Sequence, residues 1–141
     1  MIYLISDIHG MYDAFMKMLV KINFNINDKM YIIGDVVDRG NEPIQCLQYV
    51  MAQSNMEMLL GNHEDMMLKT LVNGDKGYYS CWMNNGGGIT LSQYDLLDNN
   101  SQLDILEYLR GCKLTKVIDK YILVHAGVDT SLYDTNGIKT I

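Results

Sequence analysis

Short apolar runs recur along this chain, and each is followed at once by polar or charged residues beside a glycine. The four clearest runs cover residues 2–6, 30–33, 56–60 and 121–124. Runs of this length, ended abruptly by charge, predict buried strands. Between the first three runs, apolar residues at helical spacing predict helices over 11–22 and from Pro43 to about Ala52. The order strand, helix, strand, helix, strand predicts an α/β fold built on a parallel sheet with crossover helices.

The second half of the chain has shorter helical patterns. They predict helices over residues 64–72 (opening at Asn62-His63), 78–82, 89–97 and 103–109, with a break at 98–101 and an extended segment at 112–119. Residues 127–141 are polar and show no clear element. The glycine-rich stretch 84–88 has no strand before it and no lysine after it, so a flexible turn is favoured over a phosphate-cradling loop. No repeat or linker divides the chain, which predicts one domain over 1–141.

Composition narrows the class of protein. The chain is 48% hydrophobic and 20% charged, with a formal net charge of −6, which argues against non-specific binding to nucleic acid. The three cysteines form no CxxC pair and indicate reduced thiols rather than a zinc ribbon or a disulfide frame. No apolar run approaches the roughly 20 residues that a spanning helix needs. These features predict a soluble cytoplasmic protein without a membrane partner.

Candidate chemistry lies at the ends of the four predicted strands. The segments are Asp7-Ile8-His9-Gly10, Gly34-Asp35-Val36-Val37-Asp38-Arg39-Gly40, Gly61-Asn62-His63-Glu64 and His125-Ala126-Gly127. All three histidines of the chain fall in these segments. Open α/β sheets place their sites at the carboxyl ends of the strands, so we expect the four segments to form one site.

The residue types in these segments are typical of a metal centre. Asp7 and His9 are two apart and point the same way on an extended backbone, and Asp35 can bridge two ions. Asn62 and His125 add an amide oxygen and an imidazole nitrogen. This set predicts two divalent metal ions, with Mn²⁺ favoured and Fe or Zn²⁺ as alternatives. Such a pair of ions can activate water and clamp a phosphoryl group.

The remaining polar residues suggest roles in substrate binding and proton transfer. Arg39 presents a fork of donors suited to phosphate oxygens, with Asn62 beside it. His63 could protonate a leaving oxygen, and Asp38 could orient that imidazole, so these two are the candidate catalytic pair. Glu64 is interpreted mainly as a carboxylate in the first turn of a helix, and support of a metal ligand is the lesser option.

Each segment alone has an ordinary structural explanation. Asp38 and Arg39 could form a surface ion pair, residues 61–63 a turn with a helix cap, and His125 a hydrogen-bonded core histidine. Their joint occurrence at four strand ends favours the functional interpretation.

Taken together, the four segments resemble the successive signatures of the calcineurin-like metallophosphoesterases. The nearest branch contains bacterial and phage serine/threonine protein phosphatases and symmetrical dinucleoside tetraphosphatases, and residues 82–87 also resemble a stretch common in that branch. The resemblance runs from residue 2 to about 128. It implies a sandwich of two mixed β-sheets flanked by helices.

The resemblance also implies roles for the site residues. Asp7, His9 and Asp35 are expected to hold one metal, and Asp35, Asn62 and His125 the other. Arg39 is expected to bind the substrate phosphate, with His63 as general acid oriented by Asp38. A hydroxide bridging the metals is expected to attack phosphorus directly.

Two departures from the family pattern bear on activity. Family members carry a later histidine and a later phosphate-binding arginine, whereas no histidine follows His125 and no arginine follows Arg110. We therefore expect a C-terminally truncated domain that lacks its last strands and last metal-ligand motif. Leu60 stands before Gly61, where eukaryotic-type protein phosphatases and some phage enzymes carry arginine, so nucleotide or small phosphoester substrates stay open. The favoured hypothesis is a serine/threonine-type protein phosphatase acting on phosphorylated protein or a small phosphoester. The alternatives are a symmetrical dinucleoside tetraphosphate hydrolase and an inactive metal- or phosphate-binding fragment.

Overall fold

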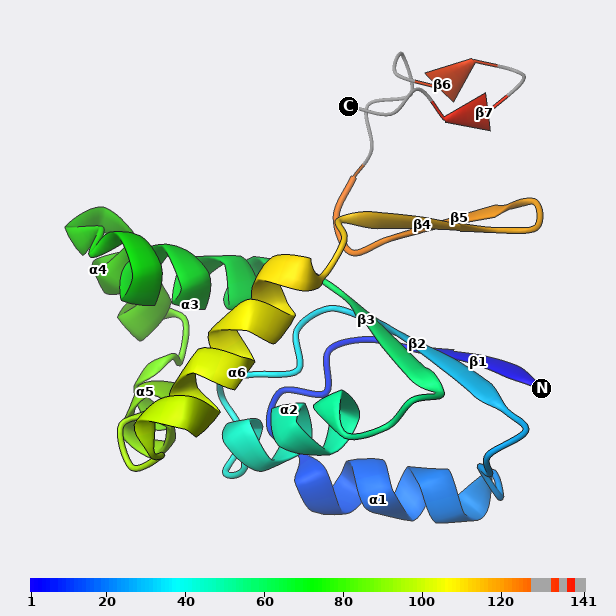
Figure 1. Ribbon diagram of the computed structural model, residues 1–141, viewed down its shortest axis with the longest axis horizontal. Coiled ribbons are helices and arrows are strands. Elements are labelled where there is room, and N and C mark those ends of the chain that lie inside the picture. The colour runs from blue at the N-terminus through cyan, green and yellow to red at the C-terminus, as the bar shows by residue number, and fades with distance from the viewer. Residues whose placement is uncertain (128–132, 135–136, 139–141) are drawn as a thin grey trace.

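A computed structural model describes residues 1–127, 133–134 and 137–138 of the chain. Its centre is a three-stranded parallel sheet in the order β1–β2–β3, formed by β1 (Ile2–Ile5), β2 (Lys29–Ile33) and β3 (Met56–Leu59). Helices α1 (Tyr12–Lys21) and α2 (Pro43–Met51) connect these strands and cover one face of the sheet (Figure 1). The predicted parallel sheet with crossover helices is confirmed.

The main core lies between this sheet and its helices. Phe15 and Leu19 of α1 and Leu47 of α2 are buried in one cluster with Met30 and Ile32 of the central strand. Alternating residues of a strand point to opposite faces, so Tyr31 faces away from these helices. The apolar residues that predicted these helices therefore form the faces by which α1 and α2 pack against the sheet.

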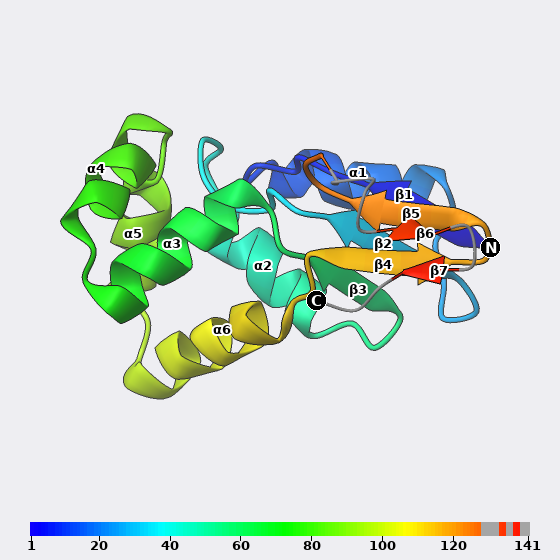
Figure 2. The same cartoon turned by 90° about the horizontal axis from the view of Figure 1, so that it is seen from above.

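The opposite face of the sheet is covered by an antiparallel hairpin of β4 (Thr115–Ile118) and β5 (Tyr121–Val124) (Figure 2). Leu123 of the hairpin is buried against Tyr31 and Leu59 in a second, smaller cluster. The strand over 121–124 thus belongs to a second sheet rather than to the parallel one. Helices, a parallel sheet and a second sheet form the layers that the resemblance implied.

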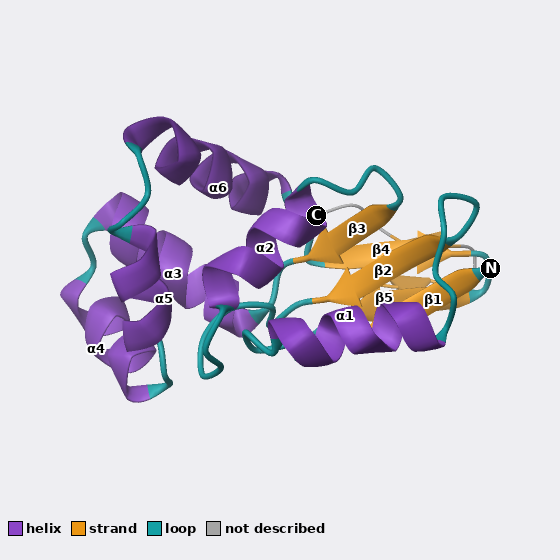
Figure 3. Ribbon diagram, turned by 90° about the horizontal axis from the view of Figure 1, so that it is seen from below, coloured by secondary structure: helices purple, strands orange, loops and turns teal. Residues whose placement is uncertain are grey.

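The remaining helices gather beyond the carboxyl ends of the parallel strands (Figure 3). They are α3 (Asn62–Asn73), α4 (Lys76–Asn84), α5 (Gly88–Tyr94) and α6 (Asn99–Gly111). The predicted break between the last two helices exists but lies at residues 95–98 rather than 98–101. Asp98 caps α6 by accepting hydrogen bonds from the backbone N–H groups of Asn100 and Ser101, so the helix begins earlier than predicted. Asp75 caps α4 in the same way, so that helix begins before the aromatic residues that predicted it.

Near the C-terminus, β6 (Tyr133–Asp134) and β7 (Gly137–Ile138) form a two-residue antiparallel pair. The prediction of no clear element over 127–141 missed this pair, and the rest of that segment after Gly127 lies outside the described residues. Within the described ranges, no helix is both long and apolar enough to cross a bilayer.

Candidate metal centre and active site

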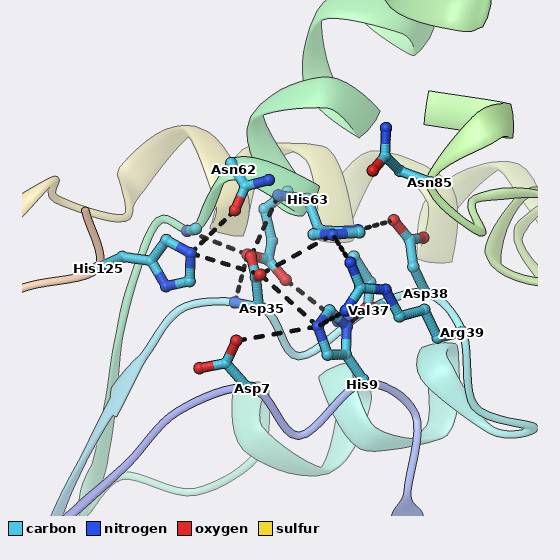
Figure 4. A network of polar contacts seen from close by, with 12 residues as sticks. Asp7, His9, Asp35, Val37, Asp38, Arg39, Asn62, His63, Asn85 and His125 are labelled. Carbon is cyan, nitrogen blue, oxygen red and sulfur yellow. Dashed lines mark hydrogen bonds and ion pairs between the residues drawn. The ribbon is translucent and has the colours of Figure 1, made fainter. Parts of the chain in front are cut away.

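The four predicted segments meet at the carboxyl ends of β1, β2 and β3 and at the end of β5 (Figure 4). The Asp35 carboxylate lies at their centre. Its Oδ2 atom is 3.4 Å from Nε2 of His125, 3.7 Å from Nε2 of His9 and 3.9 Å from Nε2 of His63. Every histidine of the chain therefore directs the same ring nitrogen at one carboxylate oxygen.

The loops that carry these residues adopt strained backbone conformations. Among the described residues, seven that are not glycine have positive φ, and five of them are in the site: Asp7 (56°), His9 (44°), Asp35 (57°), Asp38 (72°) and Arg39 (67°). Left-handed backbone is unfavourable for residues with a Cβ atom and persists only where the surroundings impose it. Backbone hydrogen bonds from Asp7 N to Gly34 O (3.2 Å) and from His9 N to Asp35 O (3.0 Å) bind the first loop to the second.

Glu64 organises the second loop, a role much larger than the first-turn helix carboxylate that the sequence suggested. The side chain is fully buried. Its Oε1 accepts hydrogen bonds from the backbone N–H groups of Val36 (2.8 Å) and Val37 (3.1 Å). Its Oε2 accepts from those of Asp35 (2.9 Å) and Gly61 (3.0 Å). One carboxylate thus fixes the backbone beside two candidate metal ligands, Asp35 and Asn62.

This environment shifts the protonation of Glu64. Burial raises the pKa of the Glu64 carboxyl, and the hydrogen bonds from Val37, Asp35 and Val36 lower it only in part, so the pKa lies above its ordinary value.

The imidazoles of His9 and His125 are held in a fixed tautomer by the backbone. Nδ1 of His9 donates to the carbonyl of Val37 (2.8 Å), and Nδ1 of His125 donates to the carbonyl of Ile33 (2.7 Å). Each Nε2 atom is then left with a lone pair that faces Asp35. This arrangement is typical of metal-ligating histidines.

The donor set fits a divalent cation. Nε2 of His125 lies 2.9 Å from Oδ1 of Asn62, and Nε2 of His9 lies 3.9 Å from a carboxylate oxygen of Asp7. With Nδ1 as the protonated nitrogen of both rings, the Nε2 lone pairs of His9 and His125 lie beside amide and carboxylate oxygens, and a cation is a partner that such a set accommodates. The structure thus brings together the five residues that the sequence predicted as metal ligands, Asp7, His9, Asp35, Asn62 and His125, and their binding of metal stays a prediction.

His63 lies in the same cluster but has different partners. The potential ligand atoms of His9, Asp35 and His63 lie within 4.8 Å of one another. However, Nδ1 of His63 donates to Oδ2 of Asp38 at 2.6 Å, and its Nε2 lies 3.1 Å from the Arg39 guanidinium. The Nδ1 partner distinguishes His63 from His9 and His125: a buried carboxylate takes the place of their backbone carbonyls, an arrangement that suits proton transfer.

The charges around His63 set its protonation. Burial lowers the pKa of the His63 imidazole, but the hydrogen bond to Asp38 and the negative charges of Asp35 and Asp38 outweigh it. The positive charge of Arg39 opposes them only in part. The pKa of His63 is therefore raised above its ordinary value, as a proton donor near neutral pH requires.

Two further residues of this site were not identified from the sequence. Trp82 and Thr90 are fully buried and both donate hydrogen bonds to the Asp38 carboxylate. Trp82 lies in the segment that strengthened the family resemblance, which was the available signal. Thr90 carries no signal in the sequence, because a lone threonine on a helix is unremarkable.

The family model described as calcineurin-like phosphoesterase matches residues 1–141. The chain is 32% identical over 133 residues to a protein of Nitrosospira multiformis named bis(5'-nucleosyl)-tetraphosphatase, symmetrical, and the match covers 90% of this chain and 43% of that protein. The chain thus spans less than half the length of this curated relative.

Solved structures share the fold. A cold-active protein tyrosine phosphatase superposes with a TM-score of 0.62 at 23% identity, over 92% of this chain and 44% of that one. A protein serine/threonine phosphatase from Saccharomyces cerevisiae superposes with a TM-score of 0.59 at 18% identity, over 92% of this chain and 42% of that one. At these identities the likeness supports the fold alone.

Proposed function

This chain belongs to the calcineurin-like phosphoesterase family, and from that premise we propose that it is a metal-dependent phosphoester hydrolase. One observation carries the proposal: all three histidines direct Nε2 at a single oxygen of Asp35, while one of them is also bound to a buried aspartate. A structural cluster needs no such convergence of lone pairs.

The convergence of these side chains supports the metal ligands that the family resemblance implies. Asp7, His9 and Asp35 would hold one divalent ion, and Asp35, Asn62 and His125 would hold the other. When bound, the ions supply Lewis-acid chemistry that activates water and offsets phosphate charge. Hard oxygen ligands with imidazole suit Mn²⁺, Fe or Zn²⁺, and Mn²⁺ remains the proposed ion.

The other residues act on the substrate. The Arg39 guanidinium lies against Nε2 of both His9 and His63, at 3.2 and 3.1 Å, so it can bind phosphate oxygens beside the metal ligands. The Asn62 amide provides a further polar contact to the phosphate. His63 delivers a proton from Nε2 to the leaving oxygen, while Asp38 holds the opposite ring nitrogen.

For the substrate we propose a symmetrical dinucleoside tetraphosphate, because the curated relative described above carries that name. A serine/threonine-type protein phosphatase is the second candidate, supported by the resemblance of the GDVVDRG and GNHE segments to that branch. Leu60 weighs against it: this side chain packs against the core and adds no cation beside Arg39. A cytoplasmic location belongs to the same proposal. The third alternative, an inactive metal- or phosphate-binding fragment, is distinguished from both enzymes by the test below.

The test compares three substrates in parallel with Mn²⁺ present: diadenosine tetraphosphate, a phosphoserine peptide and p-nitrophenyl phosphate. We expect metal-dependent hydrolysis, with the dinucleotide preferred, loss of activity in Asp35→Asn and a large reduction in His63→Asn. Equal activity in the wild-type protein and Asp35→Asn would end the catalytic assignment. Tight Mn²⁺ binding without turnover would identify a binding fragment. Preference for the phosphopeptide would favour the second candidate.

A further inference from the structure

The Asp38 carboxylate accepts hydrogen bonds from three directions. It is fully buried, and Oδ2 accepts from Nδ1 of His63 (2.6 Å) and from Nε1 of Trp82 (2.9 Å). Oδ1 accepts from the same indole (3.1 Å) and from the Thr90 hydroxyl (2.5 Å). The donors come from three different helices, α3, α4 and α5, so the position of this carboxylate depends on how those helices pack.

Thr90 forms a reciprocal pair with Asp38. Its Oγ1 donates to the Asp38 carboxylate and accepts from the Asp38 backbone N–H at 2.9 Å. A hydroxyl can do both because it carries one proton and free lone pairs. The pair fixes the side chain and the left-handed backbone of Asp38 (φ 72°) together. Threonine is β-branched and stiff about χ1, so it holds the hydroxyl in a defined direction.

Trp82 supplies a donor that cannot become an acceptor. The indole N–H can only donate a hydrogen bond, so this bond is lost if the Asp38 carboxylate rotates away from it. Gly87 leaves room for the ring, since a Cβ atom there would lie 2.5 Å from Cδ1 and Nε1 of Trp82. The indole is therefore seated in a space that the glycine-rich stretch provides.

We propose that Trp82 and Thr90 are positioning residues whose hydrogen bonds fix the orientation of the Asp38 carboxylate. The fixed carboxylate in turn holds the His63 ring with Nε2 facing the leaving oxygen. The inference rests on the proposed function for its catalytic consequence. With both oxygens held by fixed donors, rotation of the carboxylate breaks at least two buried hydrogen bonds. Trp82 and Thr90 act on the reaction only through Asp38 and His63.

The experiment uses two substrates that differ in their need for an acid. The leaving phenolate of p-nitrophenyl phosphate is stable without protonation, whereas that of phenyl phosphate is far more basic. In Thr90→Val we expect kcat for phenyl phosphate to fall by on the order of tenfold or more, as for loss of other supporting hydrogen bonds in active sites. For p-nitrophenyl phosphate we expect a fall of less than about threefold, because acid catalysis contributes little there.

Three further variants make the comparison specific. Thr90→Ser restores the hydroxyl and is expected to recover most of the rate on phenyl phosphate. Thr70→Val makes the same change at a buried hydroxyl that has no hydrogen-bond partner among the described residues, and is expected to change neither rate. Trp82→Phe removes the other donor and gives the same contrast between substrates if Thr90→Val fails to fold. Equal losses on both substrates in the folded variants would overturn the positioning role.

A second readout does not depend on turnover. In ¹H–¹⁵N spectra of the metal-free protein, the Nδ1–H proton of His63 should be protected from exchange with water, and it is assigned by its loss in His63→Gln. We expect that proton to exchange at least about tenfold faster in Thr90→Val, since its acceptor then loses one of the two side-chain donors that restrain it besides His63. An unchanged exchange rate would refute the proposal that Thr90 fixes the Asp38 carboxylate. If the wild-type protein hydrolyses neither phenyl ester, nor diadenosine tetraphosphate, nor the phosphopeptide, the proposed function fails, and this measurement still decides the inference.

Discussion

Replacing Glu64 with glutamine keeps the shape of the side chain but removes two of its acceptor contacts. The carboxylate accepts four backbone hydrogen bonds, two on each oxygen, from Val36 and Val37 and from Asp35 and Gly61. A glutamine amide has one oxygen and one NH₂ group, so two backbone donors face a donor instead of an acceptor.

The magnitude follows from those two donors. Leaving a buried donor without a partner costs about 1–3 kcal/mol, so the free energy of unfolding of Glu64→Gln should fall by about 2–6 kcal/mol. That is a large share of the roughly 5–15 kcal/mol that stabilises a typical domain. The loss arises at the backbone beside Asp35 and Asn62, so affinity for Mn²⁺ should fall with it.

The assay is urea denaturation followed by circular dichroism on the metal-free protein, which avoids mixing metal affinity into stability. The matched control is Glu57→Gln, which makes the same change at a partly exposed glutamate paired with Lys116 at 2.8 Å. Ion pairs of this kind contribute about 0–1 kcal/mol, so the control should change little. If Glu64→Gln costs less than about 1 kcal/mol, or no more than Glu57→Gln, the argument about backbone acceptors is wrong.

The remaining predictions concern metal, protonation and backbone. At [Mn²⁺] near 100 times its Kd, each bound ion should stabilise the wild-type protein by about 2.7 kcal/mol in thermal melts, and Asp35→Asn should abolish that shift. The raised pKa of His63 stabilises the metal-free fold fully below the ordinary value of 6.5 and progressively less as pH rises through the folded value. Denaturation at several pH values should show this loss, and it should be absent in His63→Gln. Gly34→Ala places a Cβ 2.5 Å from Cα of Gly61 at φ +73° and should cost about 2–5 kcal/mol. Gly74→Ala, at φ +63° with open space, should cost only about 1–2 kcal/mol, and similar losses for the two would contradict the role of close packing.

The family model and the fold neighbours agree with the phosphoesterase family that the four strand-end segments resembled. The preferred substrate class, however, changes. The sequence favoured a protein phosphatase, whereas the curated relative described above is named for dinucleoside tetraphosphates. The absence of arginine at position 60 already pointed in that direction. The expectation that further strands and a last metal ligand are missing from this chain stays a prediction.

The sequence by itself determined where the candidate metal ligands gather. Asp7, Asp35 and Asn62 follow three apolar runs joined by helices, and in a parallel sheet the carboxyl ends of such strands must meet at one edge. His125 was predicted from the same rule, although its strand lies in the second sheet.

Only the tertiary structure decided what holds the candidate metal ligands in place. Glu64 binds backbone groups up to 29 positions away, and Thr90 reaches Asp38 across 52. Contacts between a side chain and a distant backbone leave no periodic pattern, so the same glutamate at a helix start is equally consistent with a simple first-turn carboxylate. In the structure Glu64 fills both roles, because it accepts from the Gly61 N–H at the start of α3 and also from the backbone that follows β2. Only tertiary packing brings that second set of donors to the carboxylate.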